Sequence, residues 1–301
     1  MNIKGSLFDG AWYTAYRKSA CPLLEKTDVK TPFIVLRNSL RYWCADPFLF
    51  WRENTLYIFM ELYDVFRQKG VIGYRIMQNG RLSGLHVCLE TPYHLSYPYI
   101  FEKDGQIYML PESYQSGKLT LYKAAPFPDH WEPCEDFLQD KAVCDTDYIW
   151  NENEEFLLTT PVGGEKFTYD RLEMYRKENG TWQPYCGNPV VQDASRARNA
   201  GMPFAYKDRK YRPAQNCSDI YGENLVFHEI LQMDEAGYAE KTAFEAAVSD
   251  IFIAGSKRKF TGIHTYNRVQ EYEVIDLYCS SVFQPVRFLR LLLQKFVRFK
   301  G

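Results

Sequence analysis

Five stretches of the chain repeat one form, in which an apolar strand, a polar turn and a second apolar strand follow one another. Their turns recur about every 50 to 60 residues, which is near the period of β-propeller blades and is too long for helical repeats. The sequence therefore predicts five inner blade hairpins. They are DPFLFWRENTLYIFME (46–61), YPYIFEKDGQIYMLPE (97–112), DTDYIWNENEEFLLTTP (145–161), GMPFAYKDRKYRPAQ (201–215) and IHTYNRVQEYEVID (263–276).

A second hairpin pattern follows each of the first four inner hairpins, but none follows the fifth. Two N-terminal segments, AWYTAYRKS and TPFIVLRN, precede the first inner hairpin and read as strands. We expect them to supply the outer strands of the fifth blade, because strands from both chain ends would close the ring and leave few open sheet edges. The prediction is an all-β, five-bladed β-propeller over residues 1–280, closed by N-terminal strands and followed by a C-terminal amphipathic helix at 281–301.

The polar ends of these hairpins should meet at one mouth of the central channel, because the innermost strand of a blade starts where its neighbour returns. The residues found by counting from the turns are Asp46, His94, Ser96, Tyr97, Asp145, Asp147, Arg198 and His264 on the first strands, and Glu61, Glu112, Thr160, Gln215 and Asp276 on the second. Carboxylates crowded into one pocket separate in pKa, which distinguishes an acid from a base. The alternative is that these residues only cap the blade ends.

The motifs WYTAYR, ADPFLF, HLSYPYIF, IYMLPES, RPAQNCSDIYG and GIHTYN resemble the N-terminal domain family of glucosamine inositolphosphorylceramide transferases. The resemblance extends to about Asp276 and implies a five-bladed propeller related in fold to arabinanase, xylosidase and invertase-type glycosidases. It implies that Asp46 in ADPF is the base or nucleophile, with Glu112 in LPES and Asp147 in DTDY as further catalytic candidates. The plant proteins carry a separate glycosyltransferase domain, so the resemblance implies a glycan context, such as surface-polysaccharide or glycolipid biosynthesis, rather than their activity.

Two enzymatic classes fit these residues. In a glycosidase, Asp46 would activate water while Glu112 or Asp147 protonates the leaving oxygen. In a glycosyl transferase or phosphorylase, a phosphate-bearing sugar would be held by bidentate, charge-assisted bonds. The candidates for holding the phosphate are Arg198, Arg212 and His264.

The third class is a non-catalytic glycan-binding module that partners a glycosyltransferase, with tyrosine rings stacked on sugar faces. Its candidate platforms are Tyr97, Tyr148 and Tyr221. In all three classes the partner is a sugar or glycan, with or without a phosphate group. The remaining expected substrate contacts are Glu61, His94, Asp145 and Gln215.

The charge and cysteine content exclude several other partners. A formal net charge of -2 gives no bulk attraction to nucleic acid. The eight cysteines form no C-x-x-C pair, so neither a zinc knuckle nor a redox motif is expected. We predict no cofactor and no metal, although Asp145, Asp147 and His264 would be the ligands if the channel held one. The N-terminus has no signal-like apolar run, so the predicted location is cytoplasmic.

The C-terminal segment QPVRFLRLLLQKFVRFKG has basic residues on one side of a helical wheel and apolar residues on the other. Such a helix is too highly charged to span a bilayer but lies well in an anionic membrane interface. Residues 285–300 are therefore predicted to attach the protein peripherally to the inner face of the membrane. The alternative is that the helix packs against the propeller or against a second subunit.

Overall fold

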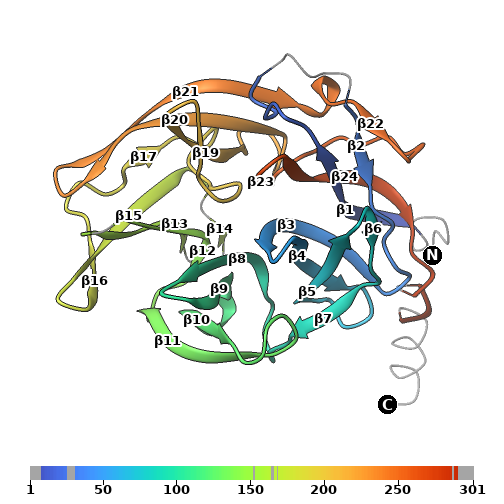
Figure 1. Ribbon diagram of the computed structural model, residues 1–301, viewed down its shortest axis with the longest axis horizontal. Helices are drawn as coiled ribbons and strands as arrows, with labels where there is room; N and C mark the ends of the chain where they lie inside the picture. Colours follow the sequence, from blue (N-terminus) through green and yellow to red (C-terminus); the bar gives the residue numbers. More distant parts are fainter. Residues whose placement is uncertain are drawn as a thin grey trace.

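The computed structural model describes residues 8–25, 31–151, 153–163, 166–167, 169–286 and 288–290. Their strands form five sheets arranged in a ring (Figure 1). Each sheet is one blade, and each predicted inner hairpin supplies the two innermost strands of its blade. The predicted all-β, five-bladed propeller is therefore confirmed.

The first three blades are built from consecutive segments of the chain. Blade I contains β3 (Tyr42–Arg52), β4 (Thr55–Asp64), β5 (Lys69–Gln78), β6 (Arg81–Leu82) and β7 (His86–Leu89). Blade II contains β8 (Ser96–Lys103), β9 (Gln106–Glu112), β10 (Lys118–Ala124) and β11 (Trp131–Gln139), with a short 3-10 turn at Tyr114–Ser116. Blade III contains β12 (Val143–Trp150), β13 (Glu155–Gly163), β14 (Lys166–Phe167), β15 (Arg171–Glu178), β16 (Thr181–Pro184) and β17 (Val191–Gln192).

The last two blades complete the ring, and only the fifth mixes the two ends of the chain. Blade IV contains β18 (Phe204–Tyr206), β19 (Arg209–Asn216), β20 (Asn224–Asp234) and β21 (Gly237–Ala247), followed by a 3-10 turn at Val248–Asp250. Blade V has the order β22 (Ile253–Ala254), β2 (Phe33–Val35), β1 (Phe8–Lys18), β24 (Tyr272–Phe283) and β23 (Tyr266–Val269).

Turn chemistry explains where the outer hairpins reverse. In each of the two Asn-Gly turns both residues have a positive φ. The angles are 51° for Asn79 and 72° for Gly80, and 50° for Asn179 and 81° for Gly180. This is the type I′ geometry that Asn-Gly favours, and its twist matches that of the flanking strands. The two Asn-Gly pairs therefore fix the reversals between β5 and β6 and between β15 and β16.

The N-terminal strand closes the ring, as the sequence predicts. β1 pairs antiparallel with β24 along nearly its whole length, from Phe8 opposite Phe283 to Lys18 opposite Tyr272. β2 then pairs with the outer edge of β1. Figure 1 shows the blue N-terminal strand β1 beside the red C-terminal strand β24. Strand β24 runs to Phe283 and so extends past the predicted domain boundary at residue 280.

The blades pack face to face through apolar side chains. The largest cluster joins blades I, II and III around Phe59, Tyr99 and Met109. A second cluster, with Tyr13, Phe227 and Tyr266, joins blades IV and V. Because these faces bury the sheets on both sides, the polar residues gather at the strand ends and the channel mouth.

The C-terminal segment begins at the end of β24. Residues 285–286 and 288–290 are helical, and most of the predicted amphipathic helix at 285–300 lies outside the described residues. In the part of the chain that the structure describes, no helix has the length and apolar character needed to cross a membrane.

Candidate functional site

Strands β3, β8 and β12 each carry one extra residue where they approach the channel mouth. The pairing shifts between Ala45 and Phe48 in β3, and the same shift occurs at the matching positions of β8 and β12. The extra residues Asp46, Tyr97 and Asp145 have φ values of 47°, 44° and 46°. A β-bulge with a non-glycine residue in this region is strained, and such bulges re-aim side chains near functional sites.

The returning strands place a second polar residue beside each bulge. Glu61 pairs with Ala45 in blade I, Glu112 pairs with Ser96 in blade II, and Thr160 occupies the same position in blade III. The same arrangement of strand ends in successive blades therefore brings carboxylates from neighbouring blades to one mouth.

Asp46, Glu61, Glu112 and Asp145 border a cavity of about 250 Å³ at the mouth of the channel. It is lined by Trp12, Trp43, Asp46, Glu61, Tyr63, His94, Ser96, Glu112, Tyr114, Asp145, Tyr169, Arg198, Tyr221 and His264. Most of the site residues predicted from the sequence are among them. The exceptions are Tyr97, Asp147, Tyr148, Thr160, Arg212, Gln215 and Asp276.

Asp46 lies at the centre of a network that joins blades I, II and V. Its carboxylate accepts hydrogen bonds from the Tyr97 N–H at 3.1 Å and the Thr265 hydroxyl at 3.0 Å. Nε2 of His264 lies 3.4 Å from Asp46, and Nδ1 of the same ring lies 2.6 Å from Asp276. Burial raises the pKa of Asp46 to about 6, although the neighbouring His264 opposes this change. Asp46 can therefore exchange a proton near neutral pH.

His264 is held by the same network. Burial lowers its pKa, but Asp276 and Asp46 outweigh burial, so the net change is upward. The ring also stacks on Trp12, with centroids 3.8 Å apart and an interplanar angle of 15°. The Asp276 carboxylate and the Trp12 ring thus fix the orientation of His264 toward Asp46.

Glu112, Asp145 and Arg198 form a second buried group across blades II, III and IV. Nε of Arg198 lies 2.5 Å from Asp145, and Nη2 lies 3.9 Å from Glu112. The Asp145 N–H donates to Glu112 at 3.3 Å, and the Gln215 amide donates to Asp145 at 2.9 Å. Burial and the charge of Asp145 raise the pKa of Glu112 well above its usual range, although Arg198 opposes them. Glu112 therefore favours its protonated form.

Glu61 is a second carboxyl group that favours the protonated form. Burial raises its pKa well above the usual range, and the nearby Asp46 and Glu112 add to this change. Nε2 of His94 lies 3.4 Å from Glu61, while the Gly70 N–H donates to Nδ1 of His94 at 3.0 Å. Burial lowers the pKa of His94 to about 4, so the ring is neutral, and because Nδ1 accepts from Gly70 its proton lies on Nε2.

Asp147 and Tyr97 lie among buried side chains and do not line the cavity. The Tyr97 hydroxyl donates to Asp147 at 2.7 Å and accepts from the Gly201 N–H at 2.8 Å. Asp147 is fully buried, and burial raises its pKa well above the usual range. In this position the two residues join blades II, III and IV, and neither side chain faces the site.

Arg212 is also placed away from the mouth. Its guanidinium is fully buried and binds the Glu240 carboxylate with two bonds, at 2.9 and 2.7 Å. It also donates to the Asn199 side chain at 3.0 Å. Tyr148, considered as a sugar platform, is buried as well, and its hydroxyl donates to Glu155 at 2.7 Å.

An aromatic rim surrounds the carboxylates, and most of it was not expected from the sequence. Trp43 stacks on Tyr63 at 4.5 Å and 12°, and the Arg198 guanidinium lies 5.0 Å from the Tyr169 ring and 5.1 Å from the Tyr221 ring. One signal was present: Tyr63 and Tyr114 each come two residues after a mouth glutamate. Alternate strand residues share a face, so this spacing pointed to the mouth at least for Tyr63 in β4.

Three buried side chains have the geometry of a possible metal site. Ligand atoms of Asp46, His264 and Asp276 all lie within 4.8 Å of one another. Two carboxylates and an imidazole are suitable ligands for several divalent ions. Each of the three is already engaged with another of them or with backbone N–H groups, so the network has partners without an ion.

The comparison with known families identifies the chain. Residues 25–261 match the family described as glucosamine inositolphosphorylceramide transferase 1, N-terminal. The chain belongs to this family. The plant relative from Arabidopsis thaliana is 30% identical over 240 residues, covering 77% of this chain and 30% of the relative. The one from Oryza sativa subsp. indica is 32% identical over 203 residues, covering 65% of this chain and 27% of the relative.

The chain thus spans less than a third of the length of these curated relatives. Among solved structures, it is similar to the catalytic domain of the family 62 α-L-arabinofuranosidase of Coprinopsis cinerea, with a TM-score of 0.57, 12% identity and coverage of 89% of this chain and 98% of that one. A family 117 glycoside hydrolase of Zobellia galactanivorans has a TM-score of 0.52, with 13% identity and 90% of each chain covered. The family and its relation in fold to glycosidase propellers, both predicted from the motifs, are confirmed.

Proposed function

We propose that this propeller binds a sugar at its channel mouth and catalyses the hydrolysis or transfer of a glycosyl group there. The observation that carries the proposal is the separation of carboxyl pKa values within one small cavity. The pKa of Asp46 is raised to about 6, whereas those of Glu112 and Glu61 are raised well above their usual range. Neighbouring carboxyl groups with different pKa values are the usual acid and base of glycosyl chemistry.

The residues take the following roles. Asp46 acts as the base, because it is the mouth carboxyl that ionises near neutral pH and His264 stabilises its charge. Glu112 acts as the acid, because it keeps its proton and can pass it to a leaving oxygen. The ring of Tyr221, which is 40% exposed, offers a surface for the apolar face of a sugar, while the carboxylates accept hydrogen bonds from its hydroxyl groups.

Proteins of the same fold support a sugar as the ligand. An α-L-arabinofuranosidase of Podospora anserina, with a TM-score of 0.55, was solved with cellotriose. An exo-β-1,3-galactanase of Phanerochaete chrysosporium, with a TM-score of 0.52, was solved with β-1,3-galactotriose. The plant relatives are named glucosamine inositolphosphorylceramide transferase 1, which supports a glycan context and leaves hydrolysis and transfer as the two candidate reactions. A cytoplasmic location and a role in polysaccharide or glycolipid biosynthesis stay predictions.

The exchange of Asp46 for asparagine tests this proposal. We expect Asp46→Asn to abolish release of the aglycone from a panel of aryl glycosides, because the amide cannot take up the proton, while sugar binding measured by NMR is retained. Asp136→Asn removes the same charge from outer strand β11 and should leave turnover unchanged. Full turnover by Asp46→Asn would refute the assignment of Asp46 as the base.

One observation favours a second candidate, a non-catalytic glycan-binding module. Arg198 pairs with Asp145 and approaches Glu112, so these groups form a rigid set that can present fixed hydrogen bonds without exchanging protons. In that case the wild-type protein would bind sugars but release no product from any glycoside or activated sugar in the panel.

A further inference from the structure

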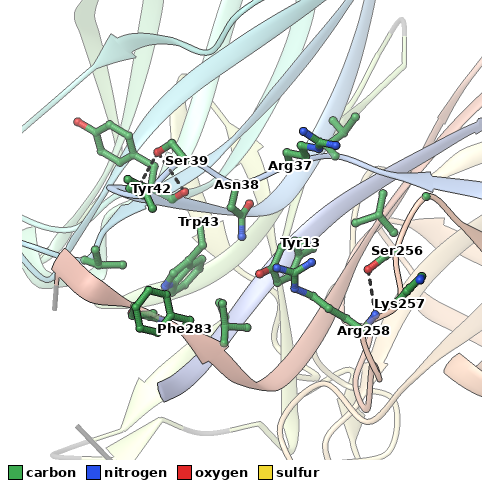
Figure 2. A pocket seen from close by; sticks show the side chains of 18 residues that line it. Tyr13, Arg37, Asn38, Ser39, Tyr42, Trp43, Ser256, Lys257, Arg258 and Phe283 are labelled. Atoms are coloured by element: carbon green, nitrogen blue, oxygen red, sulfur yellow. Dashed lines mark hydrogen bonds between the residues drawn. The ribbon is translucent and has the colours of Figure 1, made fainter. Parts of the chain in front are cut away.

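A groove of about 550 Å³ lies next to the channel mouth, and Trp43 lines both cavities. The groove is lined by strand β1, by the segment from the end of β2 to the start of β3, by Val65 after β4, by the loop at 255–258 and by the end of β24. Figure 2 shows Trp43 and Phe283 on one side of it, with Arg258 and Lys257 on the other. The groove is therefore a separate concave surface that shares one wall with the proposed sugar site.

The charge of this groove is entirely positive. Its lining includes Arg37, Lys257 and Arg258 but no aspartate or glutamate. All three cationic residues are exposed, and among the described residues none of them forms an ion pair with a carboxylate. Arg258 is held in place by the Tyr13 ring, which lies 4.9 Å from the guanidinium carbon. Three unneutralised cations around one cavity favour an anionic ligand.

The cations of the groove have no carboxylate partner, unlike the two arginines that the sequence suggested as phosphate ligands. Arg198 is buried against Asp145 and Glu112, and Arg212 is buried against Glu240. Their donors are committed to protein carboxylates, so a phosphate group would have to displace a buried partner. Arg37, Lys257 and Arg258 can bind an anion without such a loss.

The position of the groove also limits what the anion can be attached to. A ligand with its anionic group in the groove reaches the channel mouth by passing Trp43, whose ring is fixed against Tyr63. Exposed apolar side chains border the same groove, with 72% of Leu40 and 56% of Phe283 accessible to solvent. A sugar phosphate or sugar diphosphate fits this arrangement, with its sugar ring at the channel mouth and its phosphate group in the cationic groove.

We propose that the groove lined by Arg37, Lys257 and Arg258 binds the phosphate or diphosphate group of the sugar ligand whose ring occupies the channel mouth. This inference rests on the proposed function for the position of the sugar. Binding of the anion alone does not depend on it, so the two can fail separately.

Inorganic pyrophosphate tests the site directly by calorimetric titration of the full chain. The variant Arg37→Gln, Lys257→Gln, Arg258→Gln should bind pyrophosphate about tenfold more weakly or worse, because each exchange removes a charge-assisted hydrogen bond. A matched control, Arg81→Gln, Lys123→Gln, Lys210→Gln, removes three exposed charges from other blades and should bind like the wild type. All six side chains are exposed, and unchanged thermal melts will verify that both variants fold.

The outcomes separate the two proposals. Equal pyrophosphate affinity in the wild type and the groove variant, or no binding by the wild type, would overturn the anion site. Asp46→Asn should bind pyrophosphate normally. Pyrophosphate binding by the groove in a protein that binds no sugar would leave the anion site standing while the proposed sugar function fails.

A second experiment, with lipid vesicles, identifies whether the phosphate is carried by a lipid or by a soluble molecule. Co-sedimentation with phosphatidylglycerol vesicles, against phosphatidylcholine vesicles as background, compares the groove variant with the matched control. If the groove variant loses both pyrophosphate and vesicle binding, the site accepts a lipid-borne phosphate. If it loses only pyrophosphate binding, the phosphate belongs to a soluble sugar phosphate or sugar diphosphate, and both results support the anion site.

Discussion

At the scale of single residues, burial dictates the chemistry of the mouth. Asp46 is 6% exposed, and the loss of water around its carboxylate is the main reason that its pKa rises to about 6. The same cause acts on Glu61 and Glu112. Their different charged neighbours, which are His264 for Asp46, Asp46 and Glu112 for Glu61, and Asp145 and Arg198 for Glu112, then separate their pKa values.

The raised pKa of Asp46 predicts a pH dependence of stability. The folded protein binds the carboxyl proton of Asp46 more tightly than the unfolded chain, in which the pKa of this group is near 3.8. The contribution of this proton to the free energy of unfolding is therefore complete below about pH 4 and is lost as the pH rises through about 6. Asp46→Asn has no such proton. Between these pH values the free energy of unfolding of the variant should therefore rise relative to the wild type, by up to about 3 kcal/mol.

Urea denaturation of both proteins across this pH range provides the measurement. The Asp136→Asn variant, altered at a partly exposed surface position, serves as the control and should follow the wild type. A constant difference between the wild type and Asp46→Asn at all pH values would show that Asp46 is ionised throughout.

Arg212 offers a second residue-scale prediction. Arg212→Gln leaves the Glu240 carboxylate buried without its partner and should lower the free energy of unfolding by about 3–5 kcal/mol. Arg209→Gln, on the same strand, removes an exposed arginine paired with Glu229 and should cost about 1 kcal/mol or less. Both values come from urea denaturation. If Arg212→Gln were as stable as Arg209→Gln but bound sugar poorly, Arg212 would be the substrate contact that the sequence first suggested.

Sequence reasoning placed the polar residues along the chain but could not assign their partners. The polar ends of the hairpins were visible because strand, turn and strand recur at a regular spacing. The pairing of Arg212 with Glu240 was not visible, because Glu240 lies in outer strand β21 and nothing local shows which sheet face it occupies. Asp147 was misplaced for a related reason, since the bulge at Asp145 shifts the alternation of side chains in β12.

At the scale of elements, β1 has two functions that are normally separate. It supplies the strand that pairs with β24, and it carries Trp12, whose ring stacks on His264 at the channel mouth. The strand was predicted from its alternation and from the missing outer strands of blade V. The contribution of Trp12 in β1 to the site was not predicted, because a tryptophan in a strand more often packs in the core.

Deletion of residues 1–37 tests the role of this element. The truncated chain lacks β1 and β2, which leaves β24 with an open edge and removes the Trp12 ring that stacks on His264. We expect loss of the cooperative thermal transition in circular dichroism, because the five blades depend on one closed ring. Deletion of residues 1–7, which precede β1, should leave the melt unchanged. A cooperative melt at the wild-type temperature after deletion of 1–37 would show that closure by the N-terminal strand is dispensable.

At the scale of the whole molecule, the channel mouth and the groove beside it differ in the charge of the residues that line them. The mouth gathers carboxyl groups from neighbouring blades, whereas the groove beside it gathers cations from the loops around β1 and β24. With a formal net charge of only -2, neither feature is visible in the overall composition. Repetition in the sequence predicts the mouth, but the groove forms only where the two chain ends meet.

The pairing of β1 with β24 also determines how the ring responds to mechanical force. The strands are antiparallel, and Phe8 lies opposite Phe283, so tension applied to the two ends of the propeller acts on the same end of the ladder. Such a load breaks backbone hydrogen bonds one after another, as in opening a zipper, instead of shearing them all at once. A ring that is closed along a long strand can therefore be opened from its ends by a small pull.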